Sequence, residues 1–360
     1  MNFDFSEILM EVIRQKASDL HLTSGSPPML RKRGQLVPIE GLMKLTPTDT
    51  REIVYSILAN DQRQRLETDW QVDLAYTIPN RARFRVNAYF QRSAIGAAFR
   101  LIPSEIVGID KLGLPPIVHE LTRKPRGFVL VTGPTGSGKS TSLASMIDEI
   151  NSEREEHIMT IEDPIEFLHS HKSCVVNQRE LGSDAQSFGM ALRGALRQDP
   201  DVILVGEMRD LETIQTALTA AETGHLVFAT LHTQDTPQTI DRIIDVYPPH
   251  QQHQVRVQLS VALQGIVTQT LLPTADGSGR CVAVEVLIPS PAVRNLIREG
   301  KTHQIYSALQ TGGAQGMQTM DSSLAALVRS GQITRQLAEQ RSTTPEELKR
   351  LLGADGQMAA

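Results

Sequence analysis

The chain is organised around the stretch FVLVTGPTGSGKST, residues 128–141, in which an apolar run gives way to glycine, proline and small hydroxylated residues around a lysine. Gly133, Gly138, Lys139 and Ser140 satisfy the pattern GxxxxGK[ST] of a phosphate-binding loop, or P-loop. The apolar run is typical of a strand, and the following SLASMIDEI is typical of a helix. A strand, a glycine loop and a helix in this order predict a nucleoside triphosphate site.

Each residue type in this loop has a mechanical reason for its position. Gly133, Gly136 and Gly138 let successive backbone N–H groups turn inward around phosphate oxygens. The Lys139 ammonium can reach the β- and γ-phosphates, and the Ser140 hydroxyl is placed to bind Mg²⁺. The helix that follows adds a positive partial charge at its N-terminus. The sequence therefore predicts ATP and Mg²⁺ as cofactors.

Composition is that of an ordinary globular protein. The 360 residues are enough for two domains with separate cores. A net charge of -5 gives no general attraction to nucleic acid or anionic lipid. Cys174 and Cys281 are too few for a disulfide framework and lack metal-ligand spacing, so we expect buried thiols in a reducing cytosol.

The N-terminal residues 1–19 carry early acids and lack the basic start and apolar run of a signal peptide. No segment approaches the roughly 18 apolar residues that span a bilayer. We therefore expect no membrane span, and membrane association only through a partner.

The N-terminal part shows helical spacing followed by alternation. Helices are predicted over 5–16, 46–59 and 61–67, and strands around 20–22, 29–37 and within 71–102. In ARFRVNAYF, Arg83, Arg85 and Asn87 lie on the face opposite the apolar residues. This doubly basic face is either a solvated sheet surface or a source of positive charge for the polyanion bound elsewhere in the chain.

Gly108, Gly113 and the pair Pro115–Pro116 interrupt both periodicities and predict a domain boundary. We place an N-terminal α+β domain at 1–111, a linker at 112–116, an ATPase domain with C-terminal helices at 117–353, and a tail at 354–360. Strands are predicted at 128–131, 157–161, 202–205 and 226–231, and helices at 117–122, 183–197, 211–222, 290–300, 303–310, 321–329 and 345–352. This alternation predicts an α/β fold with a mostly parallel, RecA-like sheet.

Two acidic segments follow predicted strands of this sheet. In DVILVGEMRD, Glu207 is the candidate base that orients a water and accepts its proton. Many P-loop proteins carry a metal-holding aspartate where this chain has Gly206. In TIEDPIEF, Glu162, Asp163 and Glu166 would repel ATP unless a metal or proton lies among them. Another acid is therefore expected to stand behind the magnesium.

The segment TGHLVFATLHT carries His225 and His232 at the two ends of an apolar strand. At about 3.3 Å per residue they are too far apart to share one zinc ion. We expect His232 to sense the γ-phosphate and His225 to lie at a subunit contact, the alternative being two histidines that merely cap a strand. Arg193 and Arg197 project together from one helix, either as an arginine finger or in a surface ion pair.

Together, GPTGSGKS, TIEDPIEF, DVILVGEMRD and TGHLVFATLHT resemble the Walker A, Asp, Walker B and His boxes of the type II/IV secretion ATPase superfamily. AVRNLIRE, residues 292–299, resembles a motif of its PilT-type pilus retraction ATPases, with Val293 in place of isoleucine. The chain has room for neither the additional N-terminal domain nor the four-cysteine zinc site of the extension ATPases. The resemblance covers nearly the whole chain.

This resemblance implies a PAS-like N-terminal domain, a RecA-like ATPase domain and a homohexameric ring at the cytoplasmic face of the inner membrane. It implies that Glu207 is the catalytic glutamate, Glu166 the Asp-box carboxylate, and His225 and His232 the His-box pair. The nucleotide-holding residues it implies are Gly133, Pro134, Thr135, Gly136, Ser137, Gly138, Lys139, Ser140 and Thr141, with His225, Glu162 and Asp163 also assigned to nucleotide binding. Arg83, Arg85 and Arg100 resemble arginines that close over phosphate in the family.

The expected activity is ATP hydrolysis that drives type IV pilus retraction and twitching motility, with an inner-membrane pilus platform protein as partner. The AVRNLIRE helix would serve retraction rather than hydrolysis. A PilU-like accessory retraction ATPase is the nearest alternative. A RecA-like nucleic-acid translocase and a scaffold that binds ATP without turnover are the other classes, although the acidic balance and the absence of an aromatic-basic segment argue against nucleic acid.

Overall fold

The computed structural model describes residues 5–32, 34–78, 81–103 and 105–353, and these form two compact units. The first comprises Met1–Glu105 with Glu166–Leu168, and the second comprises Ile106–Ile165 and His169–Ala360. The linker predicted at 112–116 lies within the second unit, because Leu114 and the preceding Ile109 are buried in its core. The tail predicted at 354–360 lies outside the described residues.

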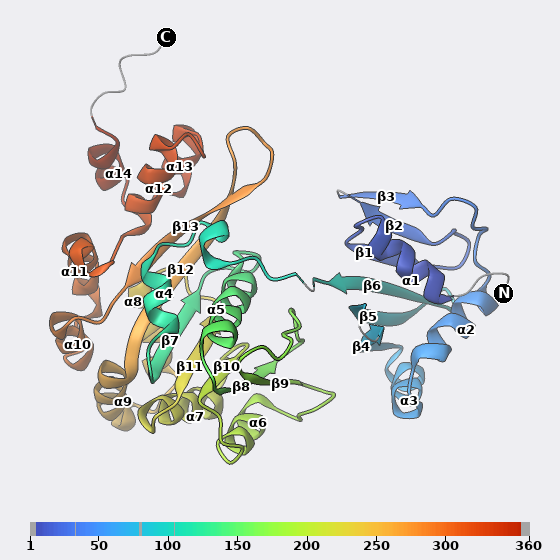
Figure 1. The fold of residues 1–360 in the computed structure, drawn as a ribbon, viewed down its shortest axis with the longest axis horizontal. Helices are drawn as coiled ribbons and strands as arrows, with labels where there is room; N and C mark the ends of the chain where they lie inside the picture. The colour runs from blue at the N-terminus through green and yellow to red at the C-terminus, as the bar shows by residue number, and fades with distance from the viewer. Residues whose placement is uncertain (1–4, 33, 79–80, 104, 354–360) are drawn as a thin grey trace, which may run out of the picture. The chain divides into compact units, whose positions relative to one another are not determined.

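The first unit is an antiparallel sheet with helices. Its elements are α1 (Phe5–Arg14), β1 (Asp19–Leu22), β2 (Met29–Lys32), β3 (Gln35–Pro38), α2 (Pro47–Ile57), α3 (Asn60–Asp69), β4 (Gln71–Ile78), β5 (Ala82–Gln91) and β6 (Ala94–Ile102). The strand order is β3-β2-β1-β6-β5-β4 (Figure 1). Phe84, Val86 and Ala88 of β5 are fully buried, which confirms the alternation predicted from the sequence.

The start of α2 follows from its first residues. The Thr46 hydroxyl accepts a hydrogen bond from the Asp49 N–H at 3.2 Å, and the Asp49 carboxylate accepts one from the Thr46 N–H at 2.8 Å. This reciprocal arrangement is a capping box, and Pro47 occupies the first helical position. The helix therefore begins where the sequence predicted.

The second unit is built on a seven-stranded mixed sheet of order β13-β12-β7-β11-β10-β8-β9, in which β13 alone runs antiparallel to its neighbour. Its strands are β7 (Gly127–Thr132), β8 (His157–Glu162), β9 (Val175–Glu180), β10 (Val202–Val205), β11 (Leu226–Leu231), β12 (Leu263–Pro273) and β13 (Arg280–Leu287). The predicted α/β fold is confirmed. Strands β9, β12 and β13 were not predicted.

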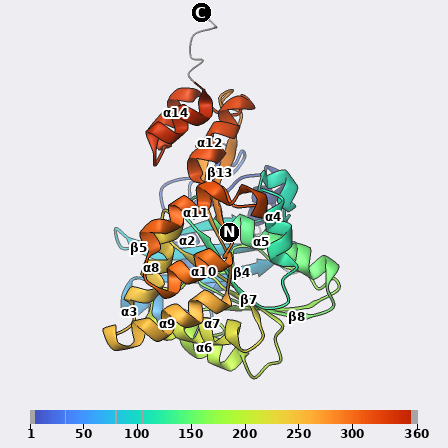
Figure 2. The ribbon, with the colours of Figure 1, turned by 90° about the vertical axis from the view of Figure 1, so that its left-hand side faces the viewer.

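Helices cover both faces of this sheet (Figures 1 and 2). They are α4 (Ile117–Thr122), α5 (Lys139–Glu153), α6 (Phe188–Ala195), α7 (Leu211–Glu222), α8 (Thr236–Asp245), α9 (Pro249–Ala262), α10 (Pro291–Arg298), α11 (Ile305–Thr311), α12 (Met320–Arg329), α13 (Arg335–Arg341) and α14 (Pro345–Leu352), with 3₁₀ turns η1 (Ile109–Leu112), η2 (Thr302–Gln304) and η3 (Gly313–Gln315). Phe128 and Leu130 of β7 face the core under α6 to α11, while Val129 and Val131 face the core under α4 and α5. The strand is therefore buried on both sides, as expected of a parallel sheet.

A third core joins the end of the β12–β13 hairpin to the last helices, where Leu272 and Ala283 pack with Met320, Leu324 and Leu348. Figure 2 shows α12 and α14 beyond the end of β13. None of the helices in the described part of the chain is long and apolar enough to cross a membrane.

Helix α6 is shorter than the predicted 183–197. It begins after Ser187, whose hydroxyl accepts a hydrogen bond from the Met190 N–H at 3.2 Å, so the cap excludes the residues before it. Helices α8, α9 and α13 were not predicted.

Candidate nucleotide-binding site

The P-loop lies between the buried strand β7 and helix α5, as predicted. Gly133 has φ 138° and Gly138, the N-cap of α5, has φ 90°, both in the region that favours glycine. A Cβ at Gly133 would lie 2.2 Å from the backbone oxygen of Gln269, so no larger residue fits. Pro134, Thr135 and Gly136 are exposed at the tip of the loop.

Lys139 is 9% exposed and folds back along the loop. Its Nζ donates to the carbonyl oxygens of Gly133 at 2.8 Å and Pro134 at 3.1 Å, and lies 3.5 Å from Nδ1 of His232. The ammonium is thus held at the mouth of the loop, where phosphate oxygens can replace carbonyl oxygens as acceptors. Ser140 and Thr141 follow, half-buried, in the first turn of α5.

Glu207 follows β10 at the carboxyl edge of the sheet, as predicted. His232 Nε2 lies 3.1 Å from its Oε1, and Arg209 contacts both oxygens, with Nε 2.6 Å from Oε1 and Nη2 2.7 Å from Oε2. Burial raises the pKa of the Glu207 carboxyl, but the Arg209 hydrogen bond and the positive charges of His232, Arg209 and Lys139 outweigh burial and lower it overall. The carboxylate is therefore ionised and able to accept a proton.

The structure explains the glycine that precedes this carboxylate. A Cβ at Gly206 would lie 3.2 Å from the Glu162 Cα and from the Ile161 carbonyl oxygen. The Gly206 N–H also donates to that carbonyl at 2.8 Å. Strands β8 and β10 approach so closely here that an aspartate at 206 would require the neighbouring backbone to shift slightly.

Glu162 and Asp163 end β8 at the same edge. Glu162 Oε1 accepts hydrogen bonds from Thr160 Oγ1 at 2.7 Å and Gln178 Nε2 at 3.2 Å. Asp163 is exposed. The hydrogen bond and charge of Glu207 raise the pKa of Arg209, and the charge of Asp163 adds a smaller effect in the same direction. The loop beyond them is held by buried Glu180, whose carboxylate accepts from the Ile165 N–H at 3.0 Å.

The two histidines are separated. His232 joins Lys139 and Glu207, whereas His225 lies at the amino end of β11, where its Nδ1 is 2.9 Å from the Ala220 carbonyl oxygen. His225 therefore does not share the edge of the sheet that carries the P-loop of its own chain. Its predicted roles in nucleotide binding and at a subunit contact stay predictions.

Glu166 is grouped with the first unit, together with Phe167 and Leu168. It is exposed. Its role as the Asp-box carboxylate stays a prediction.

The arginine face of the first unit consists of Arg83 and Arg85 on β5 and Arg100 on β6. Arg85 lies directly opposite Arg100 in the sheet register, and Arg100 Nε donates to Asp19 Oδ1 at 2.9 Å. Burial raises the pKa of Asp19, but the hydrogen bonds from Arg100 and Ser18 and the charges of Arg100 and His21 lower it overall. The predicted shared face therefore exists within this unit.

Arg193 of α6 forms an ion pair with Glu212 of α7, which is the structural alternative left open by the sequence. Arg197 is exposed. The sequence did not indicate Gln178, Glu180 or Gln269, because they lie on strands that were not predicted. Arg209 was also missed, although its position two residues after Glu207 could have suggested an ion pair with that carboxylate.

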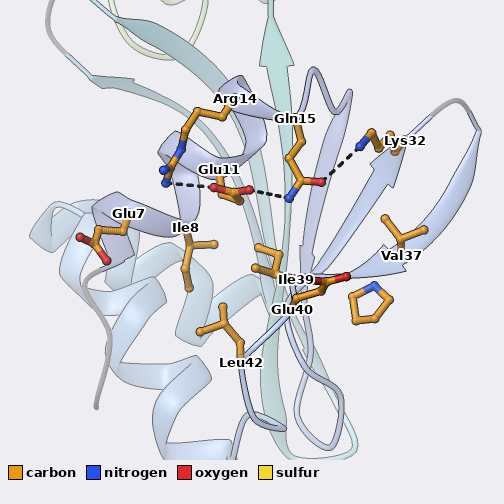
Figure 3. A pocket seen from close by; sticks show the side chains of 11 residues that line it. Glu7, Ile8, Glu11, Arg14, Gln15, Lys32, Val37, Ile39, Glu40 and Leu42 are labelled. Atoms are coloured by element: carbon orange, nitrogen blue, oxygen red, sulfur yellow. Dashed lines mark hydrogen bonds and ion pairs between the residues drawn. The ribbon is translucent and has the colours of Figure 1, made fainter.

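The first unit also holds a surface pocket of about 520 Å³ between α1 and residues 37–42 (Figure 3). Some of its polar groups are paired: Arg14 lies 2.9 Å from Glu11, and Gln15 donates to Glu11 at 2.5 Å. Lys32 donates to Gln15 at 3.5 Å. Arg83, Arg85 and Arg100 do not line it.

A lysine-headed helix behind a glycine loop, with an ionised carboxylate and a histidine at the edge of the same parallel sheet, defines the class of P-loop nucleotide hydrolases. A model of the family described as type II/IV secretion system protein matches residues 3–350. The chain belongs to this family.

Individual relatives agree with that membership. The type IV pilus retraction ATPase PilT of Pseudomonas aeruginosa is 51% identical over 343 residues, which cover 95% of this chain and 99% of the relative. A twitching motility protein of Neisseria gonorrhoeae is 50% identical over 339 residues, 92% of this chain and 90% of the relative. A crystal structure of the pilus retraction motor PilT with bound ADP superposes with a TM-score of 0.91 at 52% identity, over 97% of this chain and 100% of that one.

Proposed function

We propose that this protein is a motor ATPase that hydrolyses ATP to retract type IV pili and so supports twitching motility. The observation that carries the hydrolytic part is the group Lys139, His232 and Glu207 at the carboxyl edge of the sheet. The retraction part is supported by the likeness to PilT over nearly the whole length of both chains.

In the proposed reaction, the loop N–H groups and Lys139 bind the triphosphate. Glu207 orients the attacking water and accepts its proton, since it is ionised and at the mouth of the loop. His232 lies between Lys139 and Glu207, so a change at His232 when the γ-phosphate binds or leaves would alter its contacts with both residues. Arg209 keeps the carboxylate of Glu207 turned to this side of the sheet.

The donor set at this edge fits Mg²⁺, because it offers the Ser140 hydroxyl and the carboxylates of Glu162 and Asp163, all hard oxygen ligands. When bound, Mg²⁺ would neutralise charge on the β- and γ-phosphates. The crowding at Gly206 supports the proposal that the end of β8, rather than position 206, supplies the acid.

The proposed working form is a homohexameric ring that acts through an inner-membrane pilus platform protein at the cytoplasmic face of the inner membrane. The arginine face, Arg83, Arg85 and Arg100, supplies positive charge to bound triphosphate in this proposal, and release of phosphate removes the attraction.

The test has a biochemical and a cellular arm. Purified wild-type protein releases phosphate from Mg-ATP, and Glu207→Gln keeps nucleotide binding but loses about 100-fold or more of the rate, because an amide cannot accept the proton. Normal turnover by this variant would refute the assignment of the base. Deletion of the gene gives non-motile cells with excess surface pili, whereas bald cells would indicate extension rather than retraction.

A further inference from the structure

Strand β12 runs further than its parallel neighbour β7. The last register pair between them is Thr268 with Thr132, and the two hydroxyls lie 2.8 Å apart in the interior. β7 ends at Thr132, but β12 continues from Gln269 to Pro273 and so runs beside the P-loop that follows β7. The loop therefore has a strand beside it.

Gln269 is the first residue of this continuation, and its side chain is 1% exposed. Its Nε2 donates to the Ser137 carbonyl oxygen at 2.7 Å. The opposite amide orientation would bring two oxygens together, so the donor must face the loop. A Cβ at Gly138 would lie 3.1 Å from the same Nε2, and one at Gly133 would lie 2.2 Å from the Gln269 carbonyl oxygen. One residue thus touches the loop at its first glycine, at Ser137 and at its last glycine.

The bond to Ser137 has a geometric consequence. In a trans peptide the C=O of one residue and the N–H of the next point in opposite directions. Holding the Ser137 carbonyl toward Gln269 therefore turns the Gly138 N–H away from β12. N–H groups of a P-loop that converge on its concave side are its phosphate ligands.

The burial of Gln269 is costly for folding. Its Oε1 has no hydrogen-bond partner among the residues that the structure describes. An apolar side chain of the same length would avoid this desolvation cost. The benefit that offsets it is the hydrogen bond to the loop.

We propose that Gln269 is a positioning residue for nucleotide binding, which holds the peptide between Ser137 and Gly138 so that the Gly138 N–H faces the phosphates. This inference rests on the proposed ATP site. Gln269 does not itself contact the nucleotide.

The test uses the full-length protein with Gln269→Met, which has similar length and no donor. The matched control is Gln318→Met, because the Gln318 amide also donates to a buried-strand carbonyl, that of Val284 at 2.9 Å, away from the loop. Binding of Mg-ADP is measured by titration with a fluorescent ADP analogue, with thermal melting and amide exchange of residues 133–139 alongside. Gln269→Met weakens ADP binding roughly three- to tenfold, the effect of losing one hydrogen bond. It also raises KM for ATP more than it changes kcat, and exchange in the loop becomes faster without nucleotide. Gln318→Met leaves all three unchanged.

Gln269→Glu provides a second test at the same site, because a protonated carboxyl can still donate whereas an ionised one cannot. Its ADP affinity relative to wild type falls as the pH rises through the pKa of the introduced carboxyl, which burial raises. Wild-type affinity and loop exchange in a folded Gln269→Met protein would overturn the proposal. Absence of nucleotide binding by the wild type would instead overturn the proposed function, and the exchange rates without nucleotide still report whether Gln269 holds the loop.

Discussion

A histidine bridge ties the start of the second unit to the P-loop helix, and we predict that it makes this unit less stable at alkaline pH. His119 of α4 lies with Nε2 3.0 Å from Asp110 of η1, while its Nδ1 contacts Glu149 of α5. The Thr122 hydroxyl donates to the second oxygen of Glu149 at 2.5 Å. Hydrogen bonds and charges of Asp110 and Glu149 raise the pKa of His119 against the opposing effect of burial.

The contribution of each His119 contact to the stability of the second unit depends on how exposed its acidic partner is. The Glu149 side chain is 15% exposed, so its charged hydrogen bond to His119 is worth about 1.5 to 2 kcal/mol, whereas Asp110 is 88% exposed and adds little. Because the pKa of His119 is raised in the folded state, this stabilisation is complete below the unfolded value of about 6.5. It is lost as the pH rises through the folded value.

The assay is thermal unfolding of wild type and His119→Gln across the pH range. At about pH 6 the variant melts roughly 3–8 °C lower, and at about pH 9 the two melt together, since 1 kcal/mol moves the midpoint of a unit of this size by about 2–4 °C. Asp110→Asn serves as the control and changes little at either pH. An equal deficit of His119→Gln at both values would mean that the residue acts through packing, which would refute the charge argument.

Three further predictions concern other contacts. Arg209→Ala raises the pKa of Glu207, so the acid limb of the profile of kcat against pH moves to higher pH; an unchanged limb would mean that another group sets it. Thr46→Ala removes the cap of α2 and lowers the stability of the first unit by about 1 kcal/mol, measured by urea unfolding with the fluorescence of Trp70, the single tryptophan, while melting of the second unit is unaffected. Asp321→Ala removes a fully buried carboxylate that accepts three hydrogen bonds from residues 342–344, and the C-terminal helices lose about 3 kcal/mol, detected as faster amide exchange in α13 and α14 with no change in α5.

The sequence was most informative where one local rule decided the structure. The P-loop pattern predicted β7, the loop and α5, because Gly133 leaves no room for a Cβ and Gly138 has a φ of 90° that favours glycine. The sequence pattern predicted α7 at Leu211–Glu222 and α14 at Pro345–Leu352 with the observed bounds. Alternation gave the arginine face of β5. In each case the residues that determine the structure are close together in the sequence.

The sequence was least informative between residues 232 and 289. There β13 pairs with β12, and β12 pairs with β7, so the place of this hairpin in the sheet depends on a partner strand more than 100 residues away. Gln269 carries no local sign that it lies under the P-loop. The carboxylates after β8 were predicted, but their support by Gln178 and Glu180 required β9. The pairing of Arg193 with Glu212 likewise depends on the packing of α6 against α7.

Because β12 is long, its register determines which of its side chains pack into each of several cores. Successive residues of this one strand enter different interiors: Ile266 packs under α6 to α11, Val267 under α4 and α5, and Leu272 among the C-terminal helices. A slip of one residue would exchange every inward and outward side chain along it. The register of β12 therefore sets the packing of three cores and of the P-loop at once. An insertion within the strand would disturb all four, whereas an insertion in the turn at residues 274–279 would leave their packing unchanged.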